Sequence, residues 1–233
     1  MTDPDVRDAI MTATYEALCE KGYSDLTAQS IADRTDRSKS ALFYHYDSRE
    51  ALVAELIEYL IEGFESRVAK TRDQPALERL VAFIDWFLSA PDDDERAFHT
   101  ALLELRAQAP YNDVFRERLR ESDAHLRHAL VEILEDGIEE GVFCDHDPDA
   151  IATLLLAAFD GARIRQVTLD RNEYLETIST GVVDHILADV LDPDAELPAE
   201  ASFAFPRDER LRNDEKSPVE TATDDAEPRD TDE

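Results

Sequence analysis

The sequence predicts an all-α fold of about nine helices. Apolar residues recur at steps of three and four through most of residues 5–191, the spacing that places them on one face of an α-helix. Proline, glycine and capping residues separate these stretches, and no segment alternates apolar and polar residues as a half-buried strand does. From residue 192 on, the periodic pattern stops.

The N-terminal part of the chain divides into three predicted helices. The first covers residues 5–21 and stops at Gly22, a residue that readily takes the left-handed conformation that ends many helices. Thr27 is a good N-cap for a short second helix through residue 35. A third short helix is expected from about residue 38 to residue 46.

The rest of the helical region opens with a long fourth helix. Its start has the form of a capping box, with Asp47 as the cap and Glu50 at the third helical position. Further amphipathic segments follow, separated by proline and glycine. They cover residues 75–89, 93–108, 112–140, 148–168 and 172–191.

Residues 192–233 differ in composition from the rest of the chain. They hold 5 of the 10 prolines and 15 acidic against 5 basic residues. Few apolar side chains are available there to offset the entropy of ordering the backbone. We expect a disordered acidic tail, in which Phe203 and Phe205 are the exception that could dock locally.

Acidic residues dominate the charge of the whole chain. There are 55 Asp and Glu against 24 Lys and Arg, a formal net charge of −31, and the basic residues are 20 Arg and 4 Lys. Such an excess repels itself in dilute buffer, whereas in molar salt the Debye length falls to about 3 Å. Because the acidity extends through the predicted helices, it favours a salt-rich cytoplasm, as in halophilic archaea, over an ordinary protein with a solubilising tail.

Several protein classes fit the sequence poorly. The two cysteines, Cys19 and Cys144, cannot form a disulfide framework and lack the spacing of a zinc site, which favours a reducing cytoplasm. The acidic start lacks the order of a signal peptide. The longest mostly apolar run, residues 150–159, is about half as long as a membrane span. We therefore expect a cytoplasmic protein without a membrane partner.

The segment that indicates a function is residues 26–46. Two short helices meet there at a tight turn, with the small Ala32 letting them cross closely, which is helix-turn-helix geometry. Hydroxyl, ammonium and imidazole groups on the second helix can reach phosphates and base edges in a major groove. Residues 34–46 also carry three basic residues and one acidic residue in an otherwise strongly negative chain.

At these residues the chain resembles the TetR (tetracycline-repressor) family of transcriptional regulators. The resemblance is sharpest at residues 42–46 (LFYHY) and 48–52 (SREAL) and is supported by residues 137–143 (GIEEGVF) and 157–161 (AAFDG). It implies a ligand-responsive homodimeric repressor, in which an unidentified small molecule changes the spacing of two DNA-binding heads. The implied divisions are a DNA-binding domain (1–46), a ligand-binding and dimerisation domain (47–191) and the tail (192–233).

The helix-turn-helix and the resemblance together select the expected DNA contacts. These are Thr27, Ala28, Arg37, Ser38, Lys39, Ser40, Ala41, Tyr44, His45 and Arg49. The partner is double-stranded DNA with an inverted repeat, read by two recognition helices roughly 34 Å apart. Since phosphate contacts lose affinity as salt rises, we expect a weakly basic interface with a shallow salt dependence.

The chain departs from the family pattern at several of these positions. Asp36 stands where the turn usually has Gly, and Asp tolerates the left-handed conformation. Arg37 replaces an apolar turn residue, and Ser40 replaces a small Gly in the recognition helix. Phe43 lacks the hydroxyl of the usual Tyr, and Arg49 replaces Lys with its charge retained. The helix-turn-helix is expected to form, while an adaptor that no longer binds DNA stays an alternative.

The larger domain is expected to hold an effector cavity and the dimer seam. Bulky side chains that could line the cavity, or simply fill the core, are Phe64, Phe83, Trp86, Phe98, Leu102, Phe115 and Phe159. Small and apolar residues on the last two long helices indicate a seam between subunits, with packing inside one chain as the alternative. The expected seam residues are Leu154, Ala158, Gly161, Ala162, Ile178, Val182 and Ile186.

Polar residues on the predicted helix at residues 112–140 suggest an alternative function. One face of this helix carries Glu121, His125, His128 and Glu132. Together with a partner helix these side chains could bind a metal, as in a metal-binding or enzymatic helical bundle. The simpler interpretation is a polar face in contact with solvent. The sequence lacks the nucleotide-binding glycine motifs, the H-E-x-x-H motif and a nucleophile motif. We therefore predict no catalytic residue, no metal and no cofactor.

Overall fold

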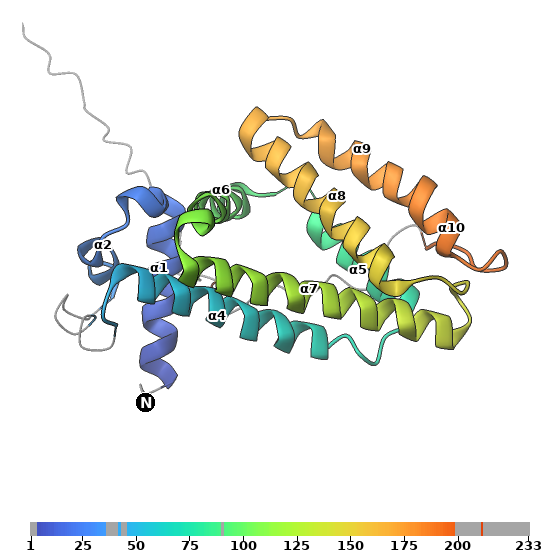
Figure 1. Ribbon diagram of the computed structural model, residues 1–233, viewed down its shortest axis with the longest axis horizontal. Helices are drawn as coiled ribbons and strands as arrows, with labels where there is room; N and C mark the ends of the chain where they lie inside the picture. The colour runs from blue at the N-terminus through green and yellow to red at the C-terminus, as the bar shows by residue number, and fades with distance from the viewer. Residues whose placement is uncertain (1–3, 36–41, 43–45, 90, 199–210, 212–233) are drawn as a thin grey trace, which may run out of the picture.

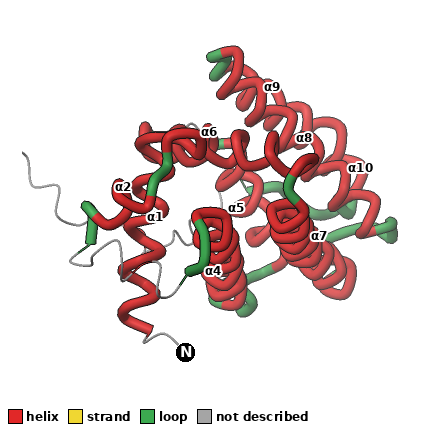
Figure 2. The backbone as a smooth tube through the Cα atoms, turned by 60° about the vertical axis from the view of Figure 1, so that its left-hand side comes forward, coloured by secondary structure: helices red, strands yellow, loops and turns green. Residues whose placement is uncertain are grey.

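The computed structural model describes residues 4–35, 42, 46–89, 91–198 and 211. In these ranges the chain is helical, apart from loops and one isolated antiparallel bridge between Phe143 and Leu191. Figure 2 shows this directly, with helices joined by loops. The prediction of an all-α fold is confirmed.

The helices follow the predicted segments closely. They are α1 (Pro4–Asp25), α2 (Ala28–Ala32), α4 (Arg49–Ala69), α5 (Ala76–Leu88), α6 (Asp93–Gln108), α7 (Asp113–Glu140), α8 (Pro148–Leu169), α9 (Glu173–Val182) and α10 (Ala188–Val190). A short 3-10 turn, η1 (Ala109–Tyr111), precedes α7, and a π-helical turn, η2 (Val183–Leu187), connects α9 to α10. Most of the third predicted helix, residues 36–41 and 43–45, lies outside the described residues.

The helix ends near the N-terminus have identifiable causes. Gly22 has φ 70° and ψ 169°, so the helical backbone of α1 stops there as predicted. The Thr27 hydroxyl accepts from the Ser30 N–H at 3.0 Å, and the Ser30 hydroxyl accepts from the Thr27 N–H at 3.1 Å. The cap of α4 is Ser48, so the prediction of Asp47 was wrong by one position. Both residue types can cap, and the local pattern does not choose between neighbours.

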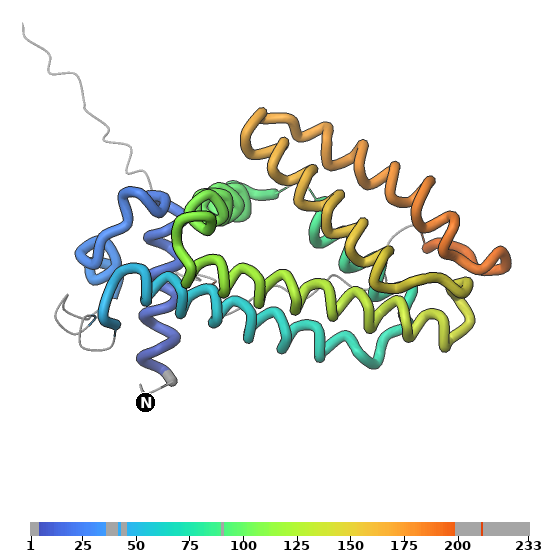
Figure 3. Tube along the Cα trace, viewed as in Figure 1, coloured from blue at the N-terminus to red at the C-terminus, as the bar shows by residue number. Residues whose placement is uncertain are grey.

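The helices assemble into a long body with a smaller unit at one end. In Figures 1 and 3, α4 and α7 run side by side along the molecule, and α8 and α9 pack together above them. Helices α1 and α2 lie at the end where α4 begins, and α6 contacts both α1 and α8. Helix α5 packs between α7, α8 and α9.

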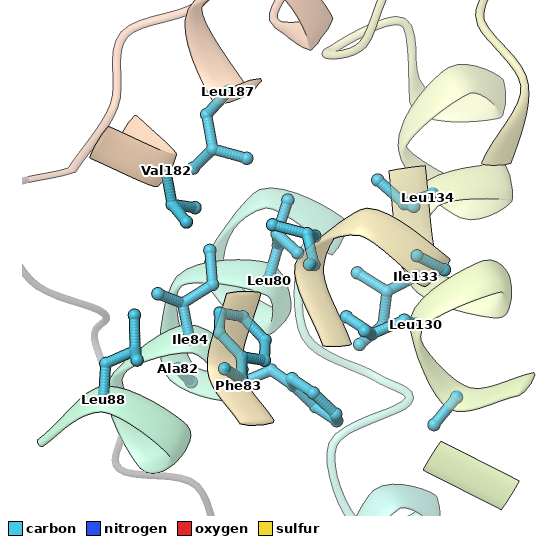
Figure 4. Packing of buried hydrophobic residues seen from close by; sticks show 14 of the residues in the cluster. Leu80, Ala82, Phe83, Ile84, Leu88, Leu130, Ile133, Leu134, Val182 and Leu187 are labelled. Atoms are coloured by element: carbon cyan, nitrogen blue, oxygen red, sulfur yellow. The ribbon is translucent and has the colours of Figure 1, made fainter. Parts of the chain in front are cut away.

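Two clusters of buried side chains hold this arrangement together. The head core joins α1, α2 and Leu42 to the first half of α4, with Ala101, Leu105 and Phe115 added from α6 and α7. The body core joins the second half of α4 to α5, α7, α8 and α9, and Figure 4 shows α5 at its centre. Fully burying one such side chain contributes roughly 1.5–3 kcal/mol. Helix α4 therefore packs in both cores.

The chain after α10 stays close to the body over its first residues. The Asp192 N–H donates to the Val142 carbonyl at 3.0 Å, and the Cys144 N–H donates to the Val190 carbonyl at 2.8 Å. Farther along the predicted tail, Leu211 packs against the head core, whereas residues 203 and 205 lie outside the described residues. None of the helices in the described ranges combines the length and apolar character needed to cross a bilayer.

Candidate functional site

Most of the residues expected to contact DNA lie outside the described part of the chain. These are Arg37, Ser38, Lys39, Ser40, Ala41, Tyr44 and His45. Leu42, within the same segment, is described and is 2% exposed. Its carbonyl accepts from the Tyr46 N–H at 2.9 Å, the spacing of an α-helical bond. Leu42 is thus part of the head core.

Thr27 and Ala28 lie at the start of α2. Thr27 is exposed and Ala28 is partly exposed, so both are open to a partner at this end of the head. The Thr27 oxygen accepts the capping bond from Ser30, which leaves the hydroxyl proton able to donate to a phosphate oxygen. The cap and a DNA contact are therefore compatible at this residue.

Arg49 has partners within the head. Its guanidinium donates to the carbonyls of Tyr23 at 3.2 Å and Leu26 at 3.3 Å, and it lies 4.4 Å from the centroid of the Tyr23 ring. It also approaches the Glu50 carboxylate at 3.4 Å. These contacts connect the start of α4 to the loop before α2. Arg49 thus holds the start of α4 in place, and its contact with DNA stays a prediction.

The other described arginines of the head also have carboxylate partners. Arg7 pairs with Glu55 at 2.7 Å and with Glu62 at 2.6 Å, which ties α1 to α4. Arg34 pairs with Glu20. Because these guanidinium charges are compensated, the described surface of the head has a weaker positive field than its arginine content suggests.

Helix α6 contacts the head at the kink of α1. The Glu104 carboxylate accepts from the Tyr23 N–H at 2.7 Å and from the Ser24 N–H at 3.4 Å. A Cβ atom at Gly22 would lie 2.5 Å from a Glu104 carboxylate oxygen. Gly22 therefore serves twice, because it adopts a positive φ and also leaves room for Glu104. No local sequence signal marked Glu104.

A cavity of about 230 Å³ lies between α1, α4, α5, α6, α7 and α8, and we call it the body cavity. Aromatic rings form much of its wall. Trp86 stacks on Phe64 with ring centroids 5.7 Å apart, and Phe87 stacks on Phe159 at 5.1 Å. Its size and apolar lining suit a small organic molecule.

The predicted cavity residues divide into two groups. Those that line the body cavity are Phe64, Trp86, Phe98, Leu102 and Phe159. Phe83 does not, because it is 0% exposed and lies behind Phe64 and Trp86 in the body core. Phe115 does not either, because it packs against the Tyr23 ring in the head core, with centroids 5.2 Å apart. Helical periodicity identifies an apolar face but not whether a core or a cavity adjoins it.

The body cavity also has a polar wall that the sequence analysis missed. It includes His99 and Arg106 from α6, and Asp160 and Arg163 from α8. Arg106 pairs with Asp160 at 2.8 Å. Burial, together with the charges of Arg163 and Arg106, lowers the pKa of His99 to about 3, so its imidazole is neutral at ordinary pH. Arg163 could have been identified from the sequence, because it is a basic residue on an otherwise apolar face of the predicted helix at residues 148–168.

The expected seam residues also divide into two groups. Ala162 and Val182 are 1% and 2% exposed and lie in the body core of their own chain, so they were wrongly assigned to a seam. Leu154 is 51% exposed, and Ala158, Gly161, Ile178 and Ile186 are partly exposed. An exposed or partly exposed stripe on α8 follows alternating steps of three and four. It comprises Leu154, Ala157, Gly161, Ile164 and Thr168.

The polar face of α7 is occupied by ion pairs. His125 contacts Glu65 at 2.7 Å, Glu121 pairs with Arg118 at 2.7 Å, and Glu132 pairs with Arg72 at 3.2 Å. His128 lies 3.9 Å from Glu132. Among the described residues, no three His, Cys, Asp or Glu side chains are grouped as metal ligands. The metal-binding alternative therefore gains no support from this face.

Comparison with known proteins matches both parts of the chain. Residues 10–56 match the family model "Bacterial regulatory proteins, tetR family", and residues 76–192 match "BetI-type transcriptional repressor, C-terminal". The chain is similar to a TetR transcription regulator from Haloarcula marismortui, at 38% identity and TM-score 0.73, covering 81% of this chain and 100% of that one.

Two further relatives are similar at lower identity. The HTH-type transcriptional repressor DhaR from Mycobacterium sp. (strain GP1) is 23% identical, over 78% of this chain and 92% of the relative. A transcriptional regulator from Saccharomonospora viridis in complex with choline is 23% identical with TM-score 0.69, covering 82% of this chain and 100% of that one. At 23% identity, the similarity to the Saccharomonospora viridis structure shows a shared fold only.

Proposed function

Because this chain belongs to the TetR family and is a DNA-binding transcriptional regulator, we propose that it is a homodimeric repressor that releases its operator when a small molecule occupies the body cavity. It acts in the cytoplasm on an inverted repeat, with residues 1–46 as the DNA-binding domain and residues 47–191 as the ligand-binding and dimerisation domain. We assign it no catalytic activity and no cofactor.

The observation that carries the ligand response is the double role of α6. This helix lines the body cavity with Phe98 and Leu102, and two residues beyond Leu102 the Glu104 carboxylate holds the kink of α1. A molecule that shifts the cavity side of α6 also shifts Glu104 and the start of the helix-turn-helix. The two sites are thereby joined by one rigid element, which is the physical requirement for coupling between them.

The DNA-binding surface proposed for each subunit is the start of α2 and the segment after it. Thr27 and Ala28 are exposed or partly exposed there, and Lys39, Tyr44 and His45 supply the polar groups of the following segment. Since the described arginines of the head are paired with carboxylates, few of the contacts are expected to be simple phosphate neutralisation. The affinity should therefore depend weakly on salt.

The proposed seam is the α8 stripe, together with the adjoining face of α9. Its small residues, Ala157 and Gly161, allow close approach of a second helix, and a Cβ at Gly161 would meet only an Arg165 nitrogen at 3.4 Å. Leu154 and Ile164 are 51% and 39% exposed in a single subunit and add apolar surface to this stripe. A pair of such helices buries this area against its symmetry copy.

Footprinting on DNA upstream of the protein's own gene, in molar KCl, tests the proposed function. We expect two protected half-sites about one helical turn, roughly 34 Å, apart. Lys39→Ala should weaken binding, whereas Lys70→Ala, an exposed lysine at the end of α4, should not. Absence of protection at any salt concentration would favour the adaptor alternative.

A further inference from the structure

Arg163 is a buried cation that forms no ion pair with a carboxylate in the described part of the chain. It is 9% exposed and forms part of the body cavity wall. Its guanidinium donates to the Gln166 side-chain oxygen at 2.8 Å, to the Phe87 carbonyl, and to the Ser89 carbonyl at 3.5 Å. Its Nε–H is buried and has no acceptor among the described residues. The hydrogen-bond acceptors that it contacts among the described residues are all uncharged.

This isolation is unexpected in a chain with 55 acidic and 24 basic residues. Within the same cavity wall, Arg106 pairs with Asp160 at 2.8 Å. Burying a charge without an opposite charge costs free energy, and burial lowers the pKa of Arg163 for that reason. Groups of this kind concentrate at binding sites, where a ligand supplies the missing charge.

The polar wall around Arg163 holds two cations, Arg106 and Arg163, and the carboxylates of Glu95, Asp123 and Asp160. Burial, followed by the charges of Arg163 and Arg106, lowers the pKa of His99 and keeps its imidazole neutral, and Arg106 pairs with Asp160. Glu95 lies on the same wall, and its charge raises the pKa of Arg163, against the larger effect of burial. Asp123 is a further carboxylate of the lining and is exposed. Of these charged residues, Arg163 is the most buried.

The remainder of the body cavity is apolar. Phe87 and Phe159 stack beside Arg163, and Trp86 and Phe64 extend the same wall. We infer that the effector is an amphipathic anion, whose carboxylate or similar acid group neutralises Arg163 and whose hydrocarbon part packs against these rings. This inference deepens the proposed function and rests on it, because it names the chemical class of the molecule that occupies the body cavity.

A cationic effector fits the same cavity less well. Aromatic walls attract cations through the faces of their rings. Here, however, the Arg67 guanidinium already lies 5.8 Å from the centroid of Trp86 and 6.0 Å from that of Phe64. A second cation would also enter next to Arg106 and Arg163. The arrangement therefore favours an anion.

Three probes of equal chain length test which charge the body cavity prefers in its ligand. Octanoate, octanol and octyltrimethylammonium are titrated into the full-length protein in molar KCl. Binding is followed by calorimetry and by the fluorescence of Trp86, which lines the cavity and is the single tryptophan of the chain. We expect octanoate to bind about tenfold more tightly than octanol, because it gains a charge-assisted contact, and the ammonium probe to bind most weakly.

Variants then test whether Arg163 causes the preference for octanoate over octanol. Arg163→Met should reduce the affinity for octanoate to that for octanol and leave octanol unchanged, while Arg163→Lys should keep the preference for the anion. Arg165→Met is the matched control, because Arg165 lies on the same helix but is exposed. If Arg163 only holds the end of α5, Arg163→Met will lower the thermal midpoint and retain the preference, which would overturn the inference.

Two further outcomes would overturn it on the wild-type protein alone. One is tighter binding of the ammonium probe than of octanoate, and the other is no binding of octanoate. These measurements use protein without DNA, so they are separate from the proposed function, which fails if the protein does not bind operator DNA. Release of operator DNA by octanoate is measured afterwards and tests the coupling between the two sites.

Discussion

Burial and neighbouring charge act together on His99. In the unfolded chain its imidazole takes up a proton near pH 6.5, whereas in the folded protein its pKa is about 3. Between these values the unfolded state binds more protons, so the free energy of unfolding is highest above pH 6.5 and falls as the pH falls. Burial makes the larger contribution to this shift, and the two arginines that add to it lie in the cavity wall for which we infer an anionic effector.

This titration predicts acid sensitivity from a single residue. From pH 6.5 to pH 5, the His99 contribution to the free energy of unfolding should fall by about 2 kcal/mol. His99→Gln should remove most of that loss, as measured by urea unfolding in molar KCl at each pH. His128→Gln, at a side chain that is 72% exposed, should behave as wild type. An unchanged pH dependence in His99→Gln would contradict the assignment.

Among the helices, the contact between α1 and α6 transmits the proposed ligand response. Its central feature is steric as well as electrostatic, because the Glu104 carboxylate occupies the space that a side chain at Gly22 would need. Removing the carboxylate leaves two backbone N–H groups without their acceptor, and adding a Cβ displaces it. The two residues should therefore be energetically coupled.

A double-mutant cycle measures this coupling. Gly22→Ala should lower the free energy of unfolding by about 1–3 kcal/mol, because of the positive φ and the clash with Glu104. In a Glu104→Ala background the same substitution should cost less, since only the backbone strain remains. Urea unfolding of the four proteins gives the coupling energy, and additive costs would show that the two residues act independently.

The α8 stripe leads to a prediction about assembly. Leu154→Arg should convert a dimer into a monomer, because it places a charge in an apolar seam. Val114→Arg is a matched control, since Val114 at the start of α7 is also 51% exposed but lies off the stripe. Light scattering in molar KCl decides the outcome. A monomeric wild-type protein, or a dimeric Leu154→Arg variant, would rule out this seam.

For the molecule as a whole, the net charge of −31 should set the conditions under which it folds. Many of the ion pairs join exposed or half-exposed side chains, and such pairs contribute about 0–1 kcal/mol each. They cannot offset the repulsion among the excess carboxylates in dilute buffer, whereas molar salt screens it. We propose on this basis that the protein is adapted to a salt-rich cytoplasm.

Circular dichroism tests this adaptation directly. Lowering KCl from the molar range to about 0.1 M should reduce helicity and shift the thermal midpoint downward, because the Debye length grows from about 3 Å to about 10 Å. Restoring KCl should restore the signal. Helicity and a thermal midpoint that are independent of salt would contradict the proposal.

Helix positions were largely predictable, because they depend on residues within a few turns of one another. The stop at Gly22 and the cap at Thr27 were both predicted and confirmed. The cap of α4 was missed by one residue, since Asp47 and Ser48 are equally suited to capping and only the path of the chain chooses between them. The adaptation to salt that the composition predicts stays a prediction.

The cavity and the seam could be predicted only in part, because they depend on contacts between residues far apart in the chain. Periodicity marked Phe83 and Phe159 alike as apolar, but only packing places the first behind the wall and the second on it. The same holds for Ala162, which faces its own core, and Leu154, which does not.

Local order along the chain thus sets where the helices begin and end and how charged their surfaces are. The packing of distant helices sets which apolar faces fill a core and which border the body cavity. It also sets the partners of each polar group, so that Arg49 donates to the Tyr23 and Leu26 carbonyls, whereas the buried Arg163 Nε–H has no acceptor among the described residues. The physical reason is that helix formation is a short-range interaction, whereas burial and electrostatic pairing depend on the final arrangement in space.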